Sequence, residues 1–250
     1  DYHAEPDFLK ALVGHFDDPR VGFVQTPHDY RDWQHNLFLT MCYWEYRAFF
    51  NTTMISLNER GAGLTVGTMC LIRKRALELA GGWSEWCVTE DSELAIRIHQ
   101  AGYSSVYVNT TFGRGLIPDT FESYKKQRYR WTAGPVQEFL NHHRHLADLE
   151  SGRYALNLTQ RIHHLHHGIH NALNGLSLPF LVINLLLIAS LVWHREIIPV
   201  PVELWLAATI TLISGIVLDY LVHKTIIRPS FREYLGKTLA VKALSYTVAL

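Results

Sequence analysis

Cysteine is scarce in this sequence. Cys42, Cys70 and Cys87 are the only 3 cysteines among 250 residues, and no Cys-x-x-Cys pair occurs. An odd number of cysteines without paired spacing argues against a disulfide framework and favours a reducing compartment. We therefore interpret all three as small buried side chains.

An excess of charge of either sign is also lacking. The chain has 23 Lys and Arg residues against 23 Asp and Glu residues, so its composition does not favour binding to nucleic acid. A signal-peptide start is missing too, because Asp1 is not followed by a charged segment and then an apolar one. The sequence stops inside the apolar stretch "LAVKALSYTVAL". Both ends look cut, and we expect a fragment of a longer chain.

Long apolar runs are missing from the first two thirds of the chain. Over residues 1–118, short apolar runs alternate with helical patterns, which predicts an α/β domain. The runs typical of strands are "VGFVQT", "LTVGTMCLI" (Leu64–Ile72) and "SVYVN", and the helical patterns are "PDFLKALVGHF", "QHNLFLTMCYWEYRAFF", "KRALELA" and "SELAIRIHQA".

Residues 119–170 are basic, aromatic and rich in histidine. Their apolar faces are interrupted, so we expect amphipathic helices at a membrane interface, broken near Gly134-Pro135 and Ser151-Gly152. One predicted helix face carries four histidines with the i, i+3, i+4, i+7 spacing, His163, His166, His167 and His170. Such pairs can chelate zinc. However, no carboxylate or cysteine lies nearby in the sequence, and weakly basic aromatic residues also suit an interface.

Residues 171–250 form the predicted membrane region. Segments 172–193 and 204–222 are long and apolar enough to cross a hydrocarbon core of about 30 Å. Basic residues flank this pair of segments, whereas the short loop between them has few. The positive-inside rule therefore places the α/β domain in the cytoplasm. Asp219 lies near the end of the second segment, where it either marks a polar pathway or reaches toward water.

The stretch "VTEDSELAIRIHQAGY" places Thr89, Glu90 and Asp91 at the start of a predicted helix. Thr and Asp commonly cap helices, and early carboxylates suit the positive end of the helix dipole. Taken alone, this triplet is typical of a cap.

A second polar motif lies in "SYKKQRYRWTAG". On a helix, Gln127, Arg130 and Trp131 share one face. Arg suits phosphate oxygens, Gln can bond hydroxyl groups, and the Trp ring can stack on a sugar. Arg and Trp also anchor helices at membrane interfaces, so the motif alone leaves both interpretations open.

The order of these motifs, however, resembles one family. The segments "DYHAEPDFL", "VGFVQTP", "VGTMCLIRKRALELAGGW", "TED" and "QRYRW", followed by apolar helices, are similar to the membrane-embedded family 2 glycosyltransferases, which include cellulose, chitin and hyaluronan synthase-like enzymes. The resemblance covers Asp1 to Trp131. It implies part of a GT-A-type fold and an inverting transfer of a hexose from a nucleotide-diphosphate sugar to a saccharide or lipid acceptor.

The resemblance also implies roles for individual residues. Asp91 becomes the general base that takes the proton from the acceptor hydroxyl, and Glu90 becomes a structural or acceptor-contacting partner. Gln127, Arg130 and Trp131 would hold the acceptor and the donor's diphosphate. General-base catalysis needs only one carboxylate within hydrogen-bond reach of that hydroxyl.

The N-terminal segment implies a metal site. Family members carry an Asp-x-Asp motif that often continues as Asp-Tyr-x-x-x-Pro-Asp, and "DYHAEPD" matches that continuation with Asp1 as the second aspartate. In the alternative register, His3 is a ligand as well. Hard oxygen ligands and a diphosphate suit Mg²⁺ or Mn²⁺.

If the first acidic motif and the nucleotide-binding strands precede Asp1, as in the family, the chain lacks most of its donor pocket, and we expect it to be inactive alone. Polysaccharide export partners are a further expectation. The alternative function is a non-catalytic membrane anchor or metal-sensing subunit of a secretion complex.

Overall fold

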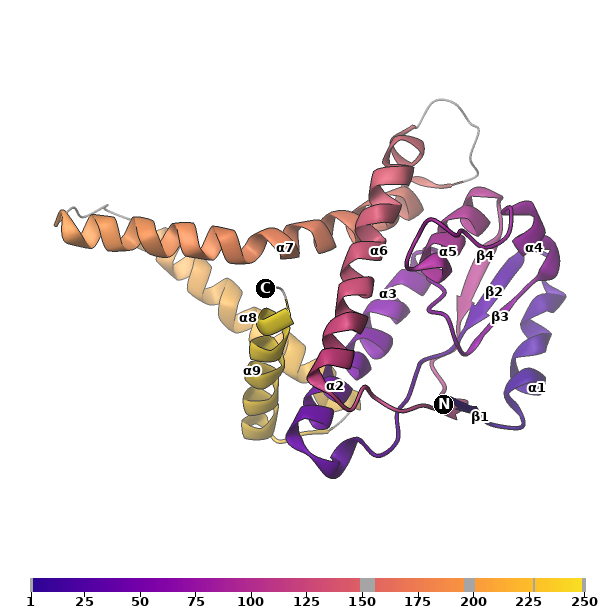
Figure 1. Ribbon diagram of the computed structural model, residues 1–250, viewed down its shortest axis with the longest axis horizontal. Coiled ribbons are helices and arrows are strands. Elements are labelled where there is room, and N and C mark those ends of the chain that lie inside the picture. Colours follow the sequence, from indigo (N-terminus) through magenta and orange to yellow (C-terminus); the bar gives the residue numbers. More distant parts are fainter. Residues whose placement is uncertain (1, 149–155, 196–200, 227, 249–250) are drawn as a thin grey trace. The chain divides into compact units, whose positions relative to one another are not determined.

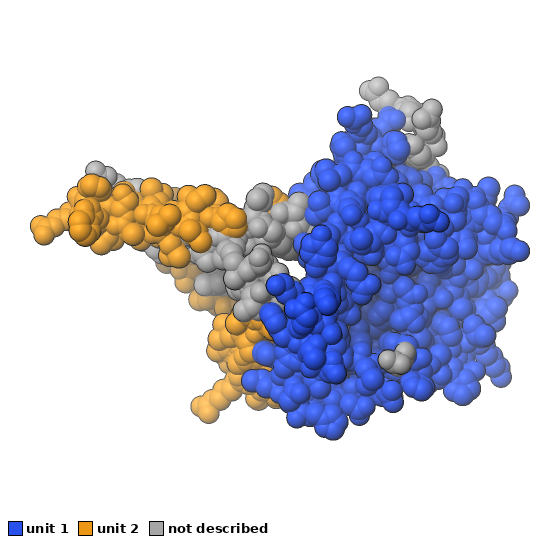
Figure 2. Space-filling view, in the orientation of Figure 1, with its two compact units in different colours: residues 1–172 blue, residues 173–250 orange. Residues whose placement is uncertain are grey.

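The computed structural model describes residues 2–148, 156–195, 201–226 and 228–248. The chain forms two compact units, Asp1–Ala172 and Leu173–Leu250, which are coloured separately in Figure 2. The finer division of the first unit at residue 118 stays a prediction.

The first unit contains a small sheet with helices beside it, so the predicted α/β class is confirmed (Figure 1). The described helices and strands of this unit are β1 (His3–Ala4), α1 (Phe8–Leu12), η1 (Val13–Asp17), β2 (Val21–Gln25), η2 (Trp33–His35), α2 (Leu37–Ala48), η3 (Phe49–Thr53), α3 (Met54–Glu59), β3 (Cys70–Ile72), α4 (Lys74–Leu79), α5 (Glu90–Gln100), β4 (Ser104–Tyr107), β5 (Gly113–Arg114) and α6 (Phe121–Ala147). Helix α7 (Leu158–Trp193) begins in this unit.

Strand β2 is the centre of the three-stranded sheet. It pairs antiparallel with β3 and parallel with β4, giving the order β3-β2-β4. All five residues of β2 are buried, as expected for a central strand with helices packed around it. Phe23 from β2 packs with Leu94 and Ile98 of α5 in the main hydrophobic core. This packing fixes α5 against the sheet.

The strand predicted over Leu64–Ile72 is only partly present, because its regular part covers Cys70–Ile72. Gly67 and Met69 both have positive φ angles, of 85° and 55°, which a β-strand cannot contain. The preceding loop is instead held by the side chain of Gln25, whose amide accepts from Val66 N and donates to the carbonyl oxygen of Thr68. A buried amide therefore replaces strand pairing here.

The helix break predicted at Gly134-Pro135 is wrong. Helix α6 runs without interruption from Phe121 to Ala147 with Pro135 inside it. Both residues of the pair are buried. Gly134 has no room for a side chain, because a Cβ atom there would overlap Thr89. The glycine serves close packing rather than a turn.

The second unit contains the rest of α7, α8 (Val202–Ile226) and α9 (Phe231–Val248). Among the residues that the structure describes, one helix is long and apolar enough to cross a membrane, over Val202–Thr225. It includes the predicted segment 204–222. The span over 172–193 stays a prediction, because several of its side chains are not described; the apolar stretch found among the described ones is Val182–Trp193.

Asp219 has a partner within this second unit. The hydroxyl group of Tyr234 on α9 donates to its Oδ2 at 2.5 Å, and His223 Nδ1 lies 3.6 Å from the same oxygen. This contact ties α8 to α9, a structural role that neither of the two sequence-based interpretations included.

Candidate active site

Asp91 lies in the first turn of α5 and is half-buried. Its Oδ1 accepts a hydrogen bond from the backbone N–H of Ser92 at 2.8 Å. Thr89 occupies the N-cap position of α5, but its side chain does not make the predicted capping hydrogen bond. Its hydroxyl group donates instead to Glu138 Oε1, at 2.7 Å. The residue thus connects α5 to α6.

The loop before β3 supports Asp91 from the other side. The hydroxyl group of Thr65 donates to the backbone carbonyl of Asp91. A Cβ atom on Gly67 would lie 3.1 Å from Asp91 Oδ2, so the loop backbone passes close to the carboxylate. Because Gln25 holds this loop, β2 and α5 together fix the position of Asp91.

The carboxylate of Asp91 has a raised proton affinity. Burial raises its pKa from 3.8 to about 6, the bond from Ser92 N lowers it, the neighbouring Glu90 raises it and Arg130 lowers it. Glu90 itself is exposed. A carboxylate with a pKa near 6 is ionised at neutral pH and is a stronger base than an ordinary aspartate.

Helix α6 brings the second predicted motif to the same region. Arg130 is exposed, and its charge acts on Asp91. Gln127 and Arg130 line a surface depression together with Lys125, Lys126 and one carboxylate, Glu122. This depression therefore has the excess of positive charge that a phosphate group requires.

Gln127 and Trp131 are held by α2. The hydroxyl group of Tyr46 donates to Gln127 Oε1, and its ring lies 5.5 Å from that of Trp131. The guanidinium carbon of Arg128 lies 4.5 Å from the centre of the Trp131 ring. Arg128 in turn is paired with Glu45 of α2 at 2.9 Å. The indole is therefore fixed by cation–π and aromatic contacts.

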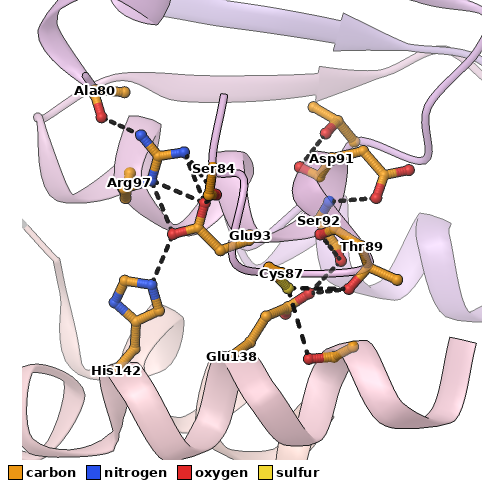
Figure 3. A network of polar contacts seen from close by, with 12 residues as sticks. Ala80, Ser84, Cys87, Thr89, Asp91, Ser92, Glu93, Arg97, Glu138 and His142 are labelled. Atoms are coloured by element: carbon orange, nitrogen blue, oxygen red, sulfur yellow. Dashed lines mark hydrogen bonds and ion pairs between the residues drawn. The ribbon is translucent and has the colours of Figure 1, made fainter. Parts of the chain in front are cut away.

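Glu138 is a residue of this site that the sequence did not reveal. It is buried on α6, and its Oε1 accepts from the hydroxyl groups of both Thr89 and Ser92, the residues on either side of the Glu90–Asp91 pair (Figure 3). Its Oε2 has no hydrogen-bond partner among the described residues. Burial raises the pKa of Glu138 to about 7, the two hydroxyl bonds lower it, and the charges of Asp91 and Glu93 raise it.

A second carboxylate, Glu93, joins the same two helices one turn further on. It is bound by Arg97 Nη2 at 2.6 Å, by His142 Nε2 at 2.8 Å and by the hydroxyl group of Ser84 (Figure 3). Burial alone would raise the pKa of Glu93, but these hydrogen bonds outweigh it and lower the pKa to about 2. Glu93 is therefore an ionised structural group rather than a catalytic acid.

The predicted metal ligands are not assembled in the described part of the chain. Asp1 lies outside the described residues, and His3 is exposed on β1. No three His, Cys, Asp or Glu side chains that the structure describes are arranged to hold a metal ion. The metal site that the sequence motif implies therefore stays a prediction.

The predicted four-histidine face is likewise divided in the structure. His166 and His170 are exposed and stack at 5.4 Å, whereas His163 and His167 are half-buried. The fully buried histidine of α7 is another one, His164, which lies 3.1 Å from His99 of α5. This pair packs α7 onto α5.

A half-buried carboxylate beside a basic, aromatic helix face is suited to group transfer to a hydroxyl. Comparison with known proteins identifies the class as glycosyltransferase. Residues 1–219 match glycosyl transferase family group 2, and the chain belongs to this family. This membership supports the GT-A-type fold predicted from the sequence.

Two individual relatives are similar to parts of the chain. A probable glucomannan 4-beta-mannosyltransferase 1 of Arabidopsis thaliana is 31% identical over 141 residues, covering 56% of this chain and 26% of that protein. The chain thus matches about a quarter of the relative's length. The mannosyltransferase PcManGT of Pyrobaculum calidifontis, solved with GDP-Man and Mn²⁺, has a TM-score of 0.49 and 17% identity, covering 98% of this chain and 59% of that one.

Proposed function

We propose that the chain contributes the general base and the acceptor-binding side chains of an inverting hexosyltransferase. The reaction moves a hexose from a nucleotide-diphosphate sugar to a hydroxyl group of a saccharide or lipid. The acceptor oxygen attacks the anomeric carbon, the bond from that carbon to the diphosphate breaks, and the diphosphate leaves with the bonding electrons. Family membership supports the glycosyl transfer, and the residues of the site support a hydroxyl group as its acceptor.

The observation that carries the proposal is the position of Asp91. One half-buried carboxylate, fixed from two sides and with its pKa raised to about 6, suits a general base. It takes the proton from the acceptor hydroxyl as that oxygen attacks. Direct displacement with inversion needs no second catalytic carboxylate.

Helix α6 supplies the groups that hold the substrates. Trp131 offers its ring to the acceptor sugar, while Gln127 and Arg130 bind the acceptor and the diphosphate. The depression that Gln127 and Arg130 share with Lys125 and Lys126 supports this assignment. Glu90, exposed beside the base, contacts the acceptor or supports the turn.

A divalent cation is the proposed cofactor. Mg²⁺ or Mn²⁺ would neutralise the charge that develops on the departing diphosphate. Asp1 is the ligand that the sequence motif suggests, with His3 in the alternative register.

We further propose that the whole protein resides in the inner or plasma membrane with this catalytic region in the cytoplasm. The apolar helix over Val202–Thr225 supports the membrane location. The interfacial placement of α6 and the first part of α7, as well as contacts with polysaccharide export partners, belong to this proposal.

The test uses membranes from cells that express the whole protein, because the chain matches only 26% of its relative's length. Labelled GDP-mannose is the first donor, since the plant relative is named a mannosyltransferase, and UDP-glucose is the second. We expect label in a saccharide or lipid product, loss of transfer on addition of EDTA, and recovery with Mn²⁺ or Mg²⁺. Full transfer in EDTA would refute the metal, and no transfer from a panel of nucleotide sugars would refute the function.

A further inference from the structure

Helix α6 carries both the substrate-binding motif and the contacts to the turn that holds the general base. Gly134, Gln137 and Glu138 all lie against residues 87–92 of the chain. Gln137 Oε1 accepts from Val88 N at 3.0 Å, and the sulfur of Cys87 lies 3.9 Å from the carbonyl oxygen of Gly134. The turn therefore rests directly on the helix.

Within this contact, Glu138 has a special position. Its one bonded oxygen, Oε1, accepts from Thr89 and from Ser92, which stand on either side of the Glu90–Asp91 pair. Ser92 is bonded twice, because its backbone N–H donates to Asp91 Oδ1 while its hydroxyl group donates to Glu138. A shift of Glu138 would consequently move Ser92 and, with it, a direct partner of the base.

Burying the carboxyl group of Glu138 without a cationic partner costs free energy. Glu138 has 2% of its surface exposed, and no cation is paired with it among the described residues. The groups that face it are acidic or neutral: Asp91 and Glu93 on α5, and Cys87 before it. The nearby His142 on the same helix is bonded to Glu93 instead. A buried carboxyl group that bonds only to hydroxyl groups suggests a positional role.

We propose that Glu138 is a positioning residue for Asp91, locking the turn at Thr89–Ser92 onto the helix that carries Gln127, Arg130 and Trp131. This inference rests on the proposed function. Through this lock, the base and the acceptor-binding side chains keep one fixed geometry. Misplacement of a catalytic group by about 1 Å can cost roughly a hundredfold in rate.

The role depends on an acceptor oxygen, not on a negative charge. Since burial raises the pKa of Glu138 to about 7, the side chain is protonated in a large share of molecules at neutral pH. Glutamine has the same shape and keeps one acceptor oxygen, so Glu138→Gln should preserve the lock. Methionine fills the same volume without an acceptor, so Glu138→Met should break it.

The experiment measures kcat and the donor KM of the whole protein in membranes. The value of kcat is expressed per donor-binding site, so that unfolded protein is not counted. We expect Glu138→Met to lower kcat by about ten- to a hundredfold with little change in the donor KM. Glu138→Gln should stay within about threefold of the wild type. The matched control is Glu78→Met on α4, an exposed glutamate that pairs with Lys74; it should change neither parameter.

A second variant keeps the test independent of folding problems at position 138. Thr89→Val retains shape but loses the hydroxyl donor, and it should also lower kcat. In the double variant Thr89→Val/Glu138→Met the loss should be smaller than the product of the two single losses, since both remove the same contact.

Three results would overturn the proposal. They are unchanged kcat in Glu138→Met and Thr89→Val, equal losses in Glu138→Gln and Glu138→Met, or a loss of total transfer that disappears when kcat is expressed per donor-binding site. Asp91→Asn is assayed in parallel. If that variant keeps full turnover, the proposed function fails as well; if it is inactive, only the role of Glu138 is in question.

Discussion

At the scale of single residues, Asp91 combines a catalytic position with an unusual environment. It lies at the N-terminal end of a helix, whose dipole favours a negative charge. Burial opposes that charge and is the largest influence, so the pKa rises to about 6. The balance keeps the group ionised at neutral pH while making it a better proton acceptor.

This environment predicts the pH dependence of transfer. Because the base must be ionised, kcat should fall as the pH drops below about 6, approaching a tenfold loss per pH unit at lower pH. Replacing Glu90 with Gln removes a charge that raises the pKa of Asp91, so the midpoint should move to lower pH. The pH–rate profiles of the wild type and Glu90→Gln test this, and a midpoint that stays put or rises in the variant would contradict it.

The sequence revealed some of the site residues and not others. Asp91, Gln127, Arg130 and Trp131 belong to short motifs whose residue types indicate chemistry directly. Glu138 carries no such signal, because its importance comes from a contact with Thr89, 49 positions away. Arg128 and Tyr46 were missed for the same reason, since a cation–π stack depends on packing between α2 and α6.

At the scale of elements, local sequence patterns predict most of the helices. Two features of the fold depend instead on tertiary contacts. The loop before β3 looks like a strand in composition but is captured by the buried amide of Gln25. Helix α6 continues through Gly134-Pro135, where the close approach of Thr89 leaves room only for a glycine. In both cases a partner distant in sequence decided the local structure.

The contact at Gly134 gives an element-scale prediction. In Gly134→Ala, the new methyl group would overlap Thr89, so α6 must move away from the turn. Overpacking of this kind costs about 1–3 kcal/mol. Urea unfolding should show this loss of stability, together with a reduced transfer rate.

Gly14→Ala is the matched control for this change, because a Cβ atom at position 14 has no neighbour within 4 Å. Because alanine suits a helical position at least as well as glycine, that variant should unfold at or slightly above the wild-type urea concentration. Equal stability of Gly134→Ala and Gly14→Ala would show that the close contact between α6 and the turn is absent.

At the scale of the whole molecule, the first unit contains the candidate site and the second contains the apolar helix over Val202–Thr225. Long apolar runs occur only late in the chain, which is why the membrane region is predicted over 171–250. The described residues show one helix long and apolar enough to cross a membrane, and the span over 172–193 stays a prediction. Hydropathy identifies candidates, but it does not decide what each helix packs against.

The account as a whole depends on Asp91 acting as the general base, and Asp91→Asn tests this most directly. Asparagine keeps the size of the side chain and can still accept from Ser92 N, but it cannot take a proton. In membranes that contain the whole protein, donor affinity should match that of the wild type, while transfer should fall by about 10²- to 10⁴-fold. Turnover within tenfold of the wild type at unchanged donor affinity would contradict the account.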